Sequence, residues 1–312
     1  MEEARQLIYS GQIARSAPAT VDDSTDCVPL ETLLAPAKEG RLEGVTPPVI
    51  PAADVLSLDK LRDPKEQTAL IWLYVASVPA WLFLALWTVG SFGIILVVIG
   101  LALLLRLVGE LWFAAYLKTN AVRVSETQLP ELFRVVQSCC SRLGMVRPDV
   151  YVMQQNIWNA FAAKIMGRRM VVLFSGAVDS ILLKGDMEQM AWLVGHELAH
   201  HRAGHLDFAR KLADVGSWCV WLKLWYSRRA EMTCDRMGLF CAGSLRASQL
   251  ALVNATVGAQ LASKVNIQEA VNQWYQHRDE FFVKYRTLYS THPHHLARLE
   301  YLGRAAAEIG VA

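Results

Sequence analysis

The segment His196-Glu197-Leu198-Ala199-His200 contains the residue types in this chain that are best suited to catalysis. On a helix, a spacing of four residues places both imidazoles on one face, about one turn apart. This arrangement suits two ligands of a zinc ion. Glu197 can then take a proton from a water held at the open metal position while that water attacks a carbonyl carbon.

A catalytic zinc normally has three protein ligands, so a third must come from elsewhere in the chain. A histidine six positions after His200 would complete the pattern HExxHxxGxxH, but Leu206 stands there and His205 lies one position too early. A later segment offers Glu231 and Asp235 at a spacing that places both on one helical face. Glu231 can bind the metal while Asp235 accepts the other ring N–H of a ligand histidine. Taken alone, the pair fits an exposed acidic face balanced by neighbouring arginines better.

The helix that carries the two histidines is predicted over residues 187–202. Asp186 followed by Gln189 is typical of a capped helix N-terminus, and residues 190–194 make the helix apolar nearly all round. Such a helix is expected to be buried, where histidines and a glutamate are costly unless they are paired or metal-bound. The alternative is a polar helix end that faces solvent beside Arg202.

The chain after Lys118 has the pattern of a mainly helical domain with a small sheet. Pro130 in the first turn and Gly144 as a stop frame one amphipathic helix. Short β-branched or apolar runs bounded by Pro, Gly and Asp predict two strands. The predicted helices cover residues 131–143, 187–202, 208–239, 247–263, 267–289 and 295–307, and the predicted strands cover 150–153 and 170–174.

An uncharged stretch from Thr68 to Leu105 precedes this domain. A single helix of 38 residues would far exceed a hydrocarbon core of about 30 Å. Residues 90–93 (Gly-Ser-Phe-Gly) break the stretch, which predicts two antiparallel membrane spans over 69–89 and 92–107, the second near the minimum length. The alternatives are a buried hairpin of a soluble core and a re-entrant hairpin that enters one leaflet.

Basic residues flank the predicted hairpin on both sides, and its turn is uncharged, so the positive-inside rule predicts that both ends and the following domain face the cytoplasm. These residues are Lys60, Arg62 and Lys65 before the hairpin and Arg106, Lys118 and Arg123 after it. The predicted organisation is a mobile Pro/Ala-rich tail (1–64), a transmembrane hairpin with its juxtamembrane segment (65–118) and a catalytic domain (119–312). The tail is expected to be a solvated linker.

Composition limits the classes of function further. A net charge of +2 without a basic run gives no electrostatic basis for binding nucleic acid. The six cysteines form no C-x-x-C pair and are mostly flanked by apolar residues, which indicates a reducing compartment. The first residues lack the basic start and apolar core of a cleavable secretory signal.

The chain resembles the HtpX-like and CAAX-prenyl-endopeptidase-like membrane zinc peptidases over roughly residues 121–302. Several separated motifs occur in the family order, with the HExxH segment and the trailing His205 among them. The others are Asn159-Ala160-Phe161-Ala162, which in the family precedes a strand lining the substrate cleft; Arg228, Glu231 and Asp235 of an RxxExxxD helix; and His292-Pro293 with Arg298 of an HPxxxxR motif.

The resemblance implies an α+β fold with a zincin-type catalytic domain and one zinc ion per chain. It also implies that His292 and Arg298 stabilise the oxyanion, that His205 and Asp235 support the ligands, and that Asn159, Ala160 and Phe161 line the substrate cleft. Cys234 departs from the small apolar residue usual at its position. Only 30 residues separate His200 from Glu231, which leaves no room for the second hairpin of some members, so a CAAX substrate is not implied.

These observations predict a membrane-anchored zinc endopeptidase in which His196, His200 and Glu231 bind the metal and Glu197 acts on the attacking water. Its expected partners are a peptide or protein substrate and the lipid bilayer, without nucleic acid. One alternative is a catalytically weak or inactive membrane adaptor, or chaperone-like protein, that retains the fold. Another is a hydrolase of amides other than peptides.

Overall fold

The computed structural model describes residues 18–19, 28–29, 57–155, 157, 159–182 and 184–311. Strands β1 (Pro18–Ala19) and β2 (Val28–Pro29) form an antiparallel pair. Apart from these strands, the predicted mobile tail lies outside the described residues as far as residue 56. Its mobility therefore stays a prediction.

From residue 57 onward, the described chain is mainly helical with one four-stranded sheet, which confirms the predicted α+β class. The helices are α3 (Leu58–Leu61), α4 (Glu66–Gly90), α5 (Ile94–Asn120), α6 (Pro130–Arg142), α7 (Ser175–Leu182), α8 (Met187–Arg202), α9 (Phe208–Leu212), the 3-10 helix η1 (Ala213–Trp218), α10 (Val220–Ala242), α11 (Leu245–Val257), α12 (Ala259–Ala262), α13 (Ile267–His277), α14 (Phe281–Tyr289) and α15 (His295–Ile309). The strands of the sheet are β3 (Val122–Arg123), β4 (Asp149–Met153), β5 (Ala160–Ile165) and β6 (Arg168–Phe174).

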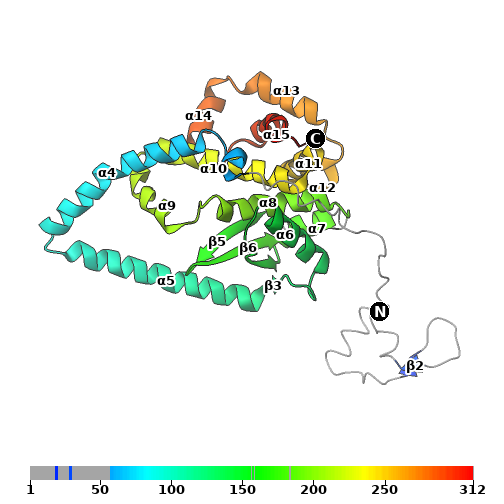
Figure 1. The fold of residues 1–312 in the computed structure, drawn as a ribbon, viewed down its shortest axis with the longest axis horizontal. Coiled ribbons are helices and arrows are strands. Elements are labelled where there is room, and N and C mark those ends of the chain that lie inside the picture. Colours follow the sequence, from blue (N-terminus) through cyan, green and yellow to red (C-terminus); the bar gives the residue numbers. More distant parts are fainter. Residues whose placement is uncertain are drawn as a thin grey trace. The chain divides into compact units, whose positions relative to one another are not determined.

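The sheet has the order β3-β4-β6-β5, with β4 parallel to β6 and the other pairs antiparallel. Successive side chains of β6 alternate between its two faces. Val171 and Leu173 join the main core with α6 and α8, whereas Met170 and Val172 pack against the end of α5. Both faces are thus covered, and β5 is an edge strand that packs beside α8 (Figure 1).

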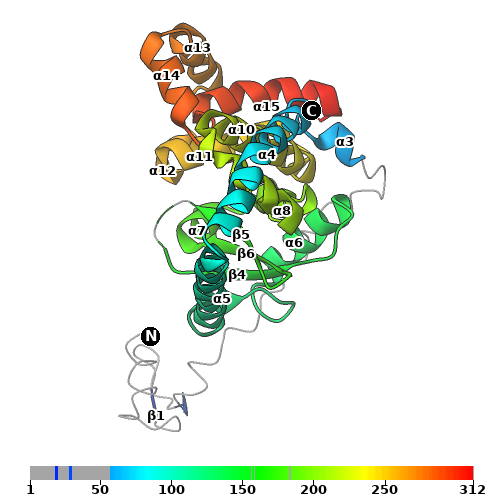
Figure 2. The same ribbon diagram turned by 90° about the vertical axis from the view of Figure 1, so that its left-hand side faces the viewer.

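Helix α8 lies at the centre of the domain, between the sheet and the layer formed by α10, α11 and α15 (Figure 2). Its predicted cap is present, since the Asp186 side chain accepts a hydrogen bond from the backbone N–H of Gln189. The predicted burial is also confirmed, because Trp192 and Leu198 are at most 2% exposed. The helix is buried along nearly its whole length.

Two glycines allow α8 and α10 to approach closely. A Cβ on Gly195 would lie 2.6 Å from Cys241 Cβ, and a Cβ on Gly238 would lie 2.8 Å from the carbonyl oxygen of Trp192. No side chain fits at either contact without a shift of one helix. The separation of the two helices that carry the candidate ligands therefore depends on these glycines.

Three predicted helices are interrupted, and these predictions were wrong in extent. The helix predicted over 208–239 is divided into α9, η1 and α10, because the chain at Gly216 lies against the backbone of α4, where a Cβ would meet Leu73 O at 2.6 Å. The helix predicted over 247–263 breaks at Gly258, whose φ is +85°. The helix predicted over 267–289 breaks before Glu280, which is extended.

Helices α4 and α5 form the predicted hairpin, and both are long and apolar enough to cross a membrane. They meet at a turn in which Phe92 and Gly93 have positive φ, and Figure 1 shows that they diverge from it. The second helix is longer than predicted, since its 27 residues span about 40 Å. Most of the hairpin surface is exposed and apolar, so the alternative of a buried hairpin is not supported.

Helix α4 also packs against η1 and α10. The indole N–H of Trp218 donates to Ala76 O (2.8 Å), the indole N–H of Trp81 donates to Leu212 O (3.3 Å), and the hydroxyl of Tyr74 donates to Ala209 O (2.8 Å). The ring of Trp218 nevertheless stays largely exposed beside the hairpin. The segment around Trp218 thus continues the apolar surface of α4.

The segment that precedes α4 belongs to the folded domain. Leu61 lies in the main core, and the buried Asp63 carboxylate accepts a hydrogen bond from the hydroxyl of Tyr301 (2.7 Å). The Arg236 guanidinium donates to the carbonyl oxygen of Lys60 (2.9 Å). The predicted domain boundary after residue 64 therefore falls within a docked segment.

The close contact between α8 and α10 generates a test of stability. We expect Gly195→Ala to lower the free energy of unfolding by about 1–3 kcal/mol, because the added methyl overpacks the contact with Cys241. Chemical denaturation of the protein in detergent, followed by circular dichroism, measures the change. Gly303→Ala is the matched control, since no atom lies within 4 Å of its Cβ position and alanine favours the helix by up to about 1 kcal/mol. Equal stability of the two variants would contradict this account.

Candidate active site

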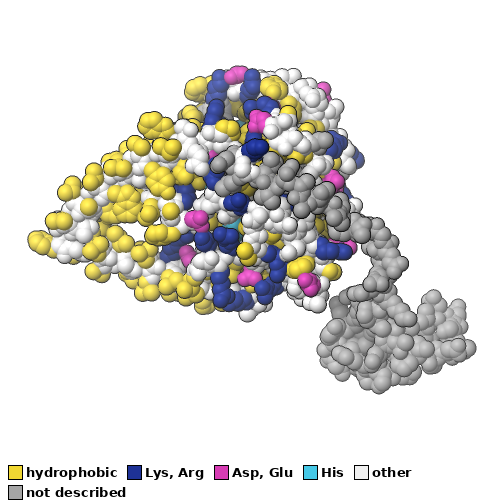
Figure 3. Space-filling model, viewed as in Figure 1, with side chains coloured by type: hydrophobic (Ala, Val, Ile, Leu, Met, Phe, Trp, Pro, Cys, Tyr) yellow, Lys and Arg dark blue, Asp and Glu magenta, His cyan; other side chains and the backbone are white. Residues whose placement is uncertain are grey.

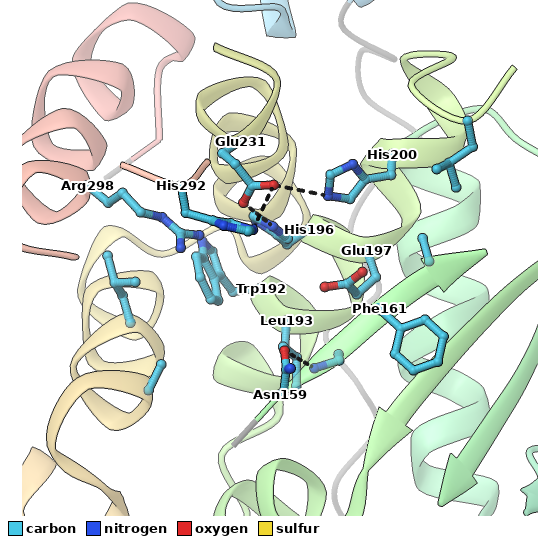
Figure 4. Close-up of a pocket in the computed structure, with 15 residues that line it drawn as sticks. Asn159, Phe161, Trp192, Leu193, His196, Glu197, His200, Glu231, His292 and Arg298 are labelled. Atoms are coloured by element: carbon cyan, nitrogen blue, oxygen red, sulfur yellow. Dashed lines mark hydrogen bonds and ion pairs between the residues drawn. The ribbon is translucent and has the colours of Figure 1, made fainter. Parts of the chain in front are cut away.

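Residues from α8, α10, β5 and the loop before α15 surround one cavity of about 290 Å³ (Figure 4). All the residues predicted to bind metal or to act on substrate line it, and Asp235 and His205 lie directly behind them. The lining residues are Asn159, Ala160, Phe161, Ala162, Trp192, Leu193, His196, Glu197, His200, Leu206, Glu231, Leu252, Ala255, His292 and Arg298.

The two histidines of α8 face one carboxylate of α10. His196 Nε2 lies 3.4 Å from Glu231 Oε2, and His200 Nε2 lies 3.7 Å from Glu231 Oε1. Burial would raise the pKa of Glu231, but its contacts with His196, and then those with His200 and Arg298, hold the pKa well below its usual range. Glu231 is therefore an ionised carboxylate that points between two imidazole nitrogens.

His196 is held from behind by a buried ion pair. Its Nδ1 lies 3.1 Å from Asp235 Oδ1, and Arg298 donates two hydrogen bonds to the same carboxylate, at 2.6 and 2.8 Å. Burial alone would lower the pKa of His196, but Asp235 and then Glu231 outweigh it and raise the pKa to about 10. The site thus favours a positive charge at His196 Nε2, which a bound cation supplies as well as a proton does.

His200 differs from His196 because no carboxylate contacts its Nδ1 in the described part of the chain. That atom lies 3.1 Å from His205 Nδ1 instead. Burial lowers the pKa of His200 to about 3, although Glu231 opposes this effect. The ring is therefore neutral near pH 7, and neutral imidazole is the form that binds metals.

Glu197 projects into the cavity below the two histidines (Figure 4). Its side chain is buried, and burial raises its pKa to about 7, while the charge of His196 opposes the rise. A carboxylate with a pKa near neutrality can both accept and return a proton. The cluster therefore holds two glutamates in different states, since Glu231 is ionised well below pH 7.

His292 and Arg298 differ in what their side chains can reach. His292 lies at the rim of the cavity, 62% exposed, and its Nε2 is 3.6 Å from Glu231 Oε1. Its other ring nitrogen lies 2.9 Å from the hydroxyl of Thr291. The guanidinium of Arg298 is buried and engaged by Asp235, so its strongest contacts go to the carboxylate that supports His196.

The segment predicted to line the substrate cleft does line the cavity, but its relation to the strand differs from the prediction. Ala160 is the first residue of β5, so the segment begins the strand rather than preceding it. Its start is fixed by Asn159, whose side chain accepts from Ala160 N–H (2.9 Å). Phe161 packs between Phe113 of α5 and Phe174, with ring centroids 6.0 and 5.8 Å apart.

Cys234 is a second candidate donor beside the histidines. Its Sγ lies within 4.8 Å of ring nitrogens of His196 and His200. Burial, together with the nearby Glu231, raises the pKa of this thiol well above its usual value. Since the thiolate is the metal-binding form, Cys234 is a poorer ligand here than the ionised Glu231.

Sequence reasoning missed the apolar lining and one buried acid. Five apolar residues line the cavity without any motif. Packing of α8 against α11 brings Trp192 and Leu193 together with Leu252 and Ala255, and the turn after α8 adds Leu206. The missed acid is Glu66, which is fully buried and faces His205 Nε2 at 3.2 Å. Its signal in the sequence is a lone acidic residue at the start of an uncharged stretch.

Curated relatives share moderate similarity with the chain. The Plastoglobule-localized metallopeptidase 48 of Arabidopsis thaliana is 26% identical over 49% of this chain and 48% of its own length, so the match spans about half of that relative. A Protease HtpX homolog of Thermococcus kodakarensis is 25% identical over 62% of this chain and 79% of its own length. A Protease HtpX homolog of Nostoc sp. is 30% identical over 36% of this chain and 39% of its own length. No solved structure matches the chain.

These similarities confirm the resemblance to HtpX-like peptidases that the motifs indicated. The model of Peptidase family M48 matches residues 126–220 and 207–306, together more than half of the chain and including every candidate ligand and Glu197, and the chain therefore belongs to this family.

Proposed function

We propose that this protein is a membrane-anchored, zinc-dependent endopeptidase. The observation that carries the proposal is the convergence of His196 Nε2, His200 Nε2 and the ionised Glu231 carboxylate beside the buried Glu197 in one cavity. Membership of a peptidase family supports it, as do relatives named as proteases.

The donor set fits a zinc ion. Two imidazole nitrogens and one carboxylate oxygen are a common ligand set of catalytic zinc, and they leave one position open. The high negative charge around His196 supports a cation at this place, since Glu231 and Asp235 are both ionised. We propose Glu231 as the third ligand in preference to Cys234, whose thiol is kept protonated.

Zinc held by these residues would supply Lewis-acid chemistry, which polarises the attacking water and the scissile carbonyl. Glu197 takes the proton of that water and returns it to the leaving amine, a role that suits a buried carboxylate with a pKa near 7. His292, at the rim, donates its Nε2–H to the developing oxyanion. Arg298 holds Asp235, and Asp235 in turn fixes the ring of His196.

The cleft suits an extended peptide with an apolar side chain. The cavity is bordered by the edge strand β5, whose outer backbone groups can pair with a substrate strand. Leu193, Leu252 and Ala255 add an apolar lining to the cavity. These features favour peptides over other amides as the substrate class.

The apolar hairpin supports membrane anchoring. Figure 3 shows hydrophobic side chains over most of the hairpin, with Lys and Arg side chains where it joins the catalytic domain. Leu86, Val89 and Phe92 are more than 70% exposed, which is costly in water and favourable in lipid. The basic flanks favour a catalytic domain in the cytoplasm, with Trp218 and Trp221 at the membrane interface.

The proposed ligands predict how much zinc the wild-type protein and a ligand variant retain. Wild-type protein purified in detergent should retain about one zinc per chain, and a His196→Ala, His200→Ala double variant should lose it, because a single remaining carboxylate binds zinc weakly. Elemental analysis measures the metal, and circular dichroism checks the fold. His277→Ala is the control, since this exposed histidine lies in α13 and contacts Glu280. One retained zinc per double-variant chain would remove these histidines from the ligand set.

The proposed base predicts a separation of metal binding from turnover. Glu197→Gln keeps the shape of the side chain but cannot accept a proton, so zinc content should persist while kcat falls by about 10²-fold or more. In the wild type, kcat/KM should decline as pH falls through a pKa at or below about 7, because Glu197 must be ionised and a bound cation lowers its pKa further. Peptide cleavage measured across pH gives both results. A Glu197→Gln protein that lacks zinc would identify a ligand rather than a base.

The proposed orientation predicts which residues an impermeant thiol reagent reaches in intact cells. In a background with Cys27 and Cys219 replaced by Ser, Phe92→Cys at the exposed hairpin turn should react from outside. Ser125→Cys, on the domain side, should react only after permeabilisation. Labelling of Ser125→Cys in intact cells would reverse the orientation. Protection of Phe92→Cys would indicate a re-entrant hairpin.

A further inference from the structure

Glu66, the first residue of α4, is a buried acid that the mechanism above does not use. Its carboxylate is fully buried and is contacted by three side chains. Arg62 and Thr233 donate hydrogen bonds to it, and His205 Nε2 lies 3.2 Å from its Oε1. Of these three contacts, only the one with His205 leads on to a proposed metal ligand.

His205 connects this carboxylate to a proposed metal ligand. Its ring is 5% exposed, with Nε2 directed to Glu66 and Nδ1 directed to His200 Nδ1 at 3.1 Å. Cys234 Sγ, a weak donor, lies 3.7 Å from the same Nδ1. His205 thus has an acceptor on one side and possible donors on the other.

The donor and acceptor roles in the series of hydrogen bonds from Glu66 through His205 to His200 follow from the carboxylate of Glu66. A carboxylate that already receives hydrogen bonds from Arg62 and Thr233 can only accept, so His205 must carry its proton on Nε2. When the ring carries one proton, His205 Nδ1 is then an acceptor. The Nδ1–H of His200, at 3.1 Å, is a nearer and stronger donor to it than the thiol of Cys234 at 3.7 Å. This tautomer leaves the lone pair of His200 Nε2 free, facing Glu231.

His196 reaches the same state by a shorter route. Asp235 accepts its Nδ1–H directly, which directs His196 Nε2, where a proton or a cation can bind, toward Glu231. A hydrogen bond donated by a metal-binding histidine to a carboxylate is a general way to fix the tautomer and orientation of the ring. At His200 the carboxylate acts through an intervening histidine.

We propose that Glu66 is a positioning residue for the metal site, which acts through His205 to hold His200 in the tautomer that can bind metal. This inference rests on the proposed zinc ligands. Because Glu66 begins α4, the apolar hairpin supplies part of the metal site in addition to an anchor. The state of His200 depends on the docking of the hairpin on the catalytic domain.

Three variants test the two contacts, Glu66 with His205 and His205 with His200. His205→Phe fills the space of the ring but removes the acceptor for His200, and it should weaken zinc binding by roughly 10- to 100-fold. His205→Asn places an amide oxygen near the position of Nδ1 and should restore most of the affinity. Glu66→Gln exchanges a charged acceptor for a neutral one and should weaken zinc binding by roughly 10-fold.

Asp63→Asn is the matched control. Asp63 is another buried acid of the same docked segment, but its side chain contacts Tyr301 and Arg229 and does not reach the histidines. Its replacement should lower stability while leaving zinc affinity unchanged. The control thus distinguishes a loss of α4 docking, which lowers stability, from a change in the His200 tautomer, which lowers zinc affinity.

Zinc affinity is measured by chelator competition on each full-length protein in detergent, with the visible absorption of the cobalt-substituted protein as a second readout. We expect His205→Phe and Glu66→Gln to bind more weakly and to alter the cobalt spectrum, unlike Asp63→Asn. Wild-type affinity and spectrum in folded Glu66→Gln and His205→Phe would overturn the inference, as would an equal loss in Asp63→Asn. If the wild type itself binds no zinc, the proposed function fails instead.

Discussion

The structure depends on one buried group of charges at the contact between α8 and α10. His196, Glu231 and Asp235 are each at most 7% exposed, and Arg298 joins them from α15. Charges at such depth are tolerated only when each has a partner, and removing one partner of a buried pair typically costs about 3–5 kcal/mol. Gly195 and Gly238 bring the helices close enough for the pairs to form. Packing and electrostatics therefore impose the same helix separation.

The cluster also determines how the peripheral helices are held. Asp235 connects α10 to α15 through Arg298, and Glu66 connects the start of α4 to the turn after α8 through Arg62 and His205. Phe113 of α5 packs on Phe161 at the opposite border of the cavity. Each helix of the hairpin thus contacts a residue at or next to the site, α4 through Glu66 and α5 through Phe113, although the hairpin itself extends away from the domain.

The local part of the site could be predicted from the sequence. The range predicted for α8 is the observed one, and its cap and burial were readable because a single helix face and its first turn are local properties. Glu231 and Asp235 were found because their spacing marks one face of a second helix. The roles of these residues stay predictions. Leu252 and Ala255 could not be found, since only tertiary packing brings them to the cavity, and the contact of Glu66 with His205 likewise depends on the docking of α4.

The extents of the long helices were predicted less well for a related reason. The break around η1 is caused by the approach of α4, which lies some 140 residues earlier, as the hydrogen bond between Trp218 and Ala76 illustrates. The strand β5 has no alternation of apolar and polar residues, because Phe161 faces α5 while Ala160 lies in the main core. Contacts between distant segments thus override local propensity at both places.

Because residues 57–66 pack into the domain, the folded domain extends beyond the region that is similar to the family. The similarity to the M48 family begins at residue 126, yet Leu61 occupies the core and Asp63 pairs with Tyr301 near the other end of the chain. A fragment excised at the border of the similarity would leave Tyr301 without the buried Asp63 and Thr233 without the buried Glu66, and Arg236 would lose its hydrogen bond to Lys60 O. The region that matches the family is therefore shorter than the part of the chain that packs as one folded domain.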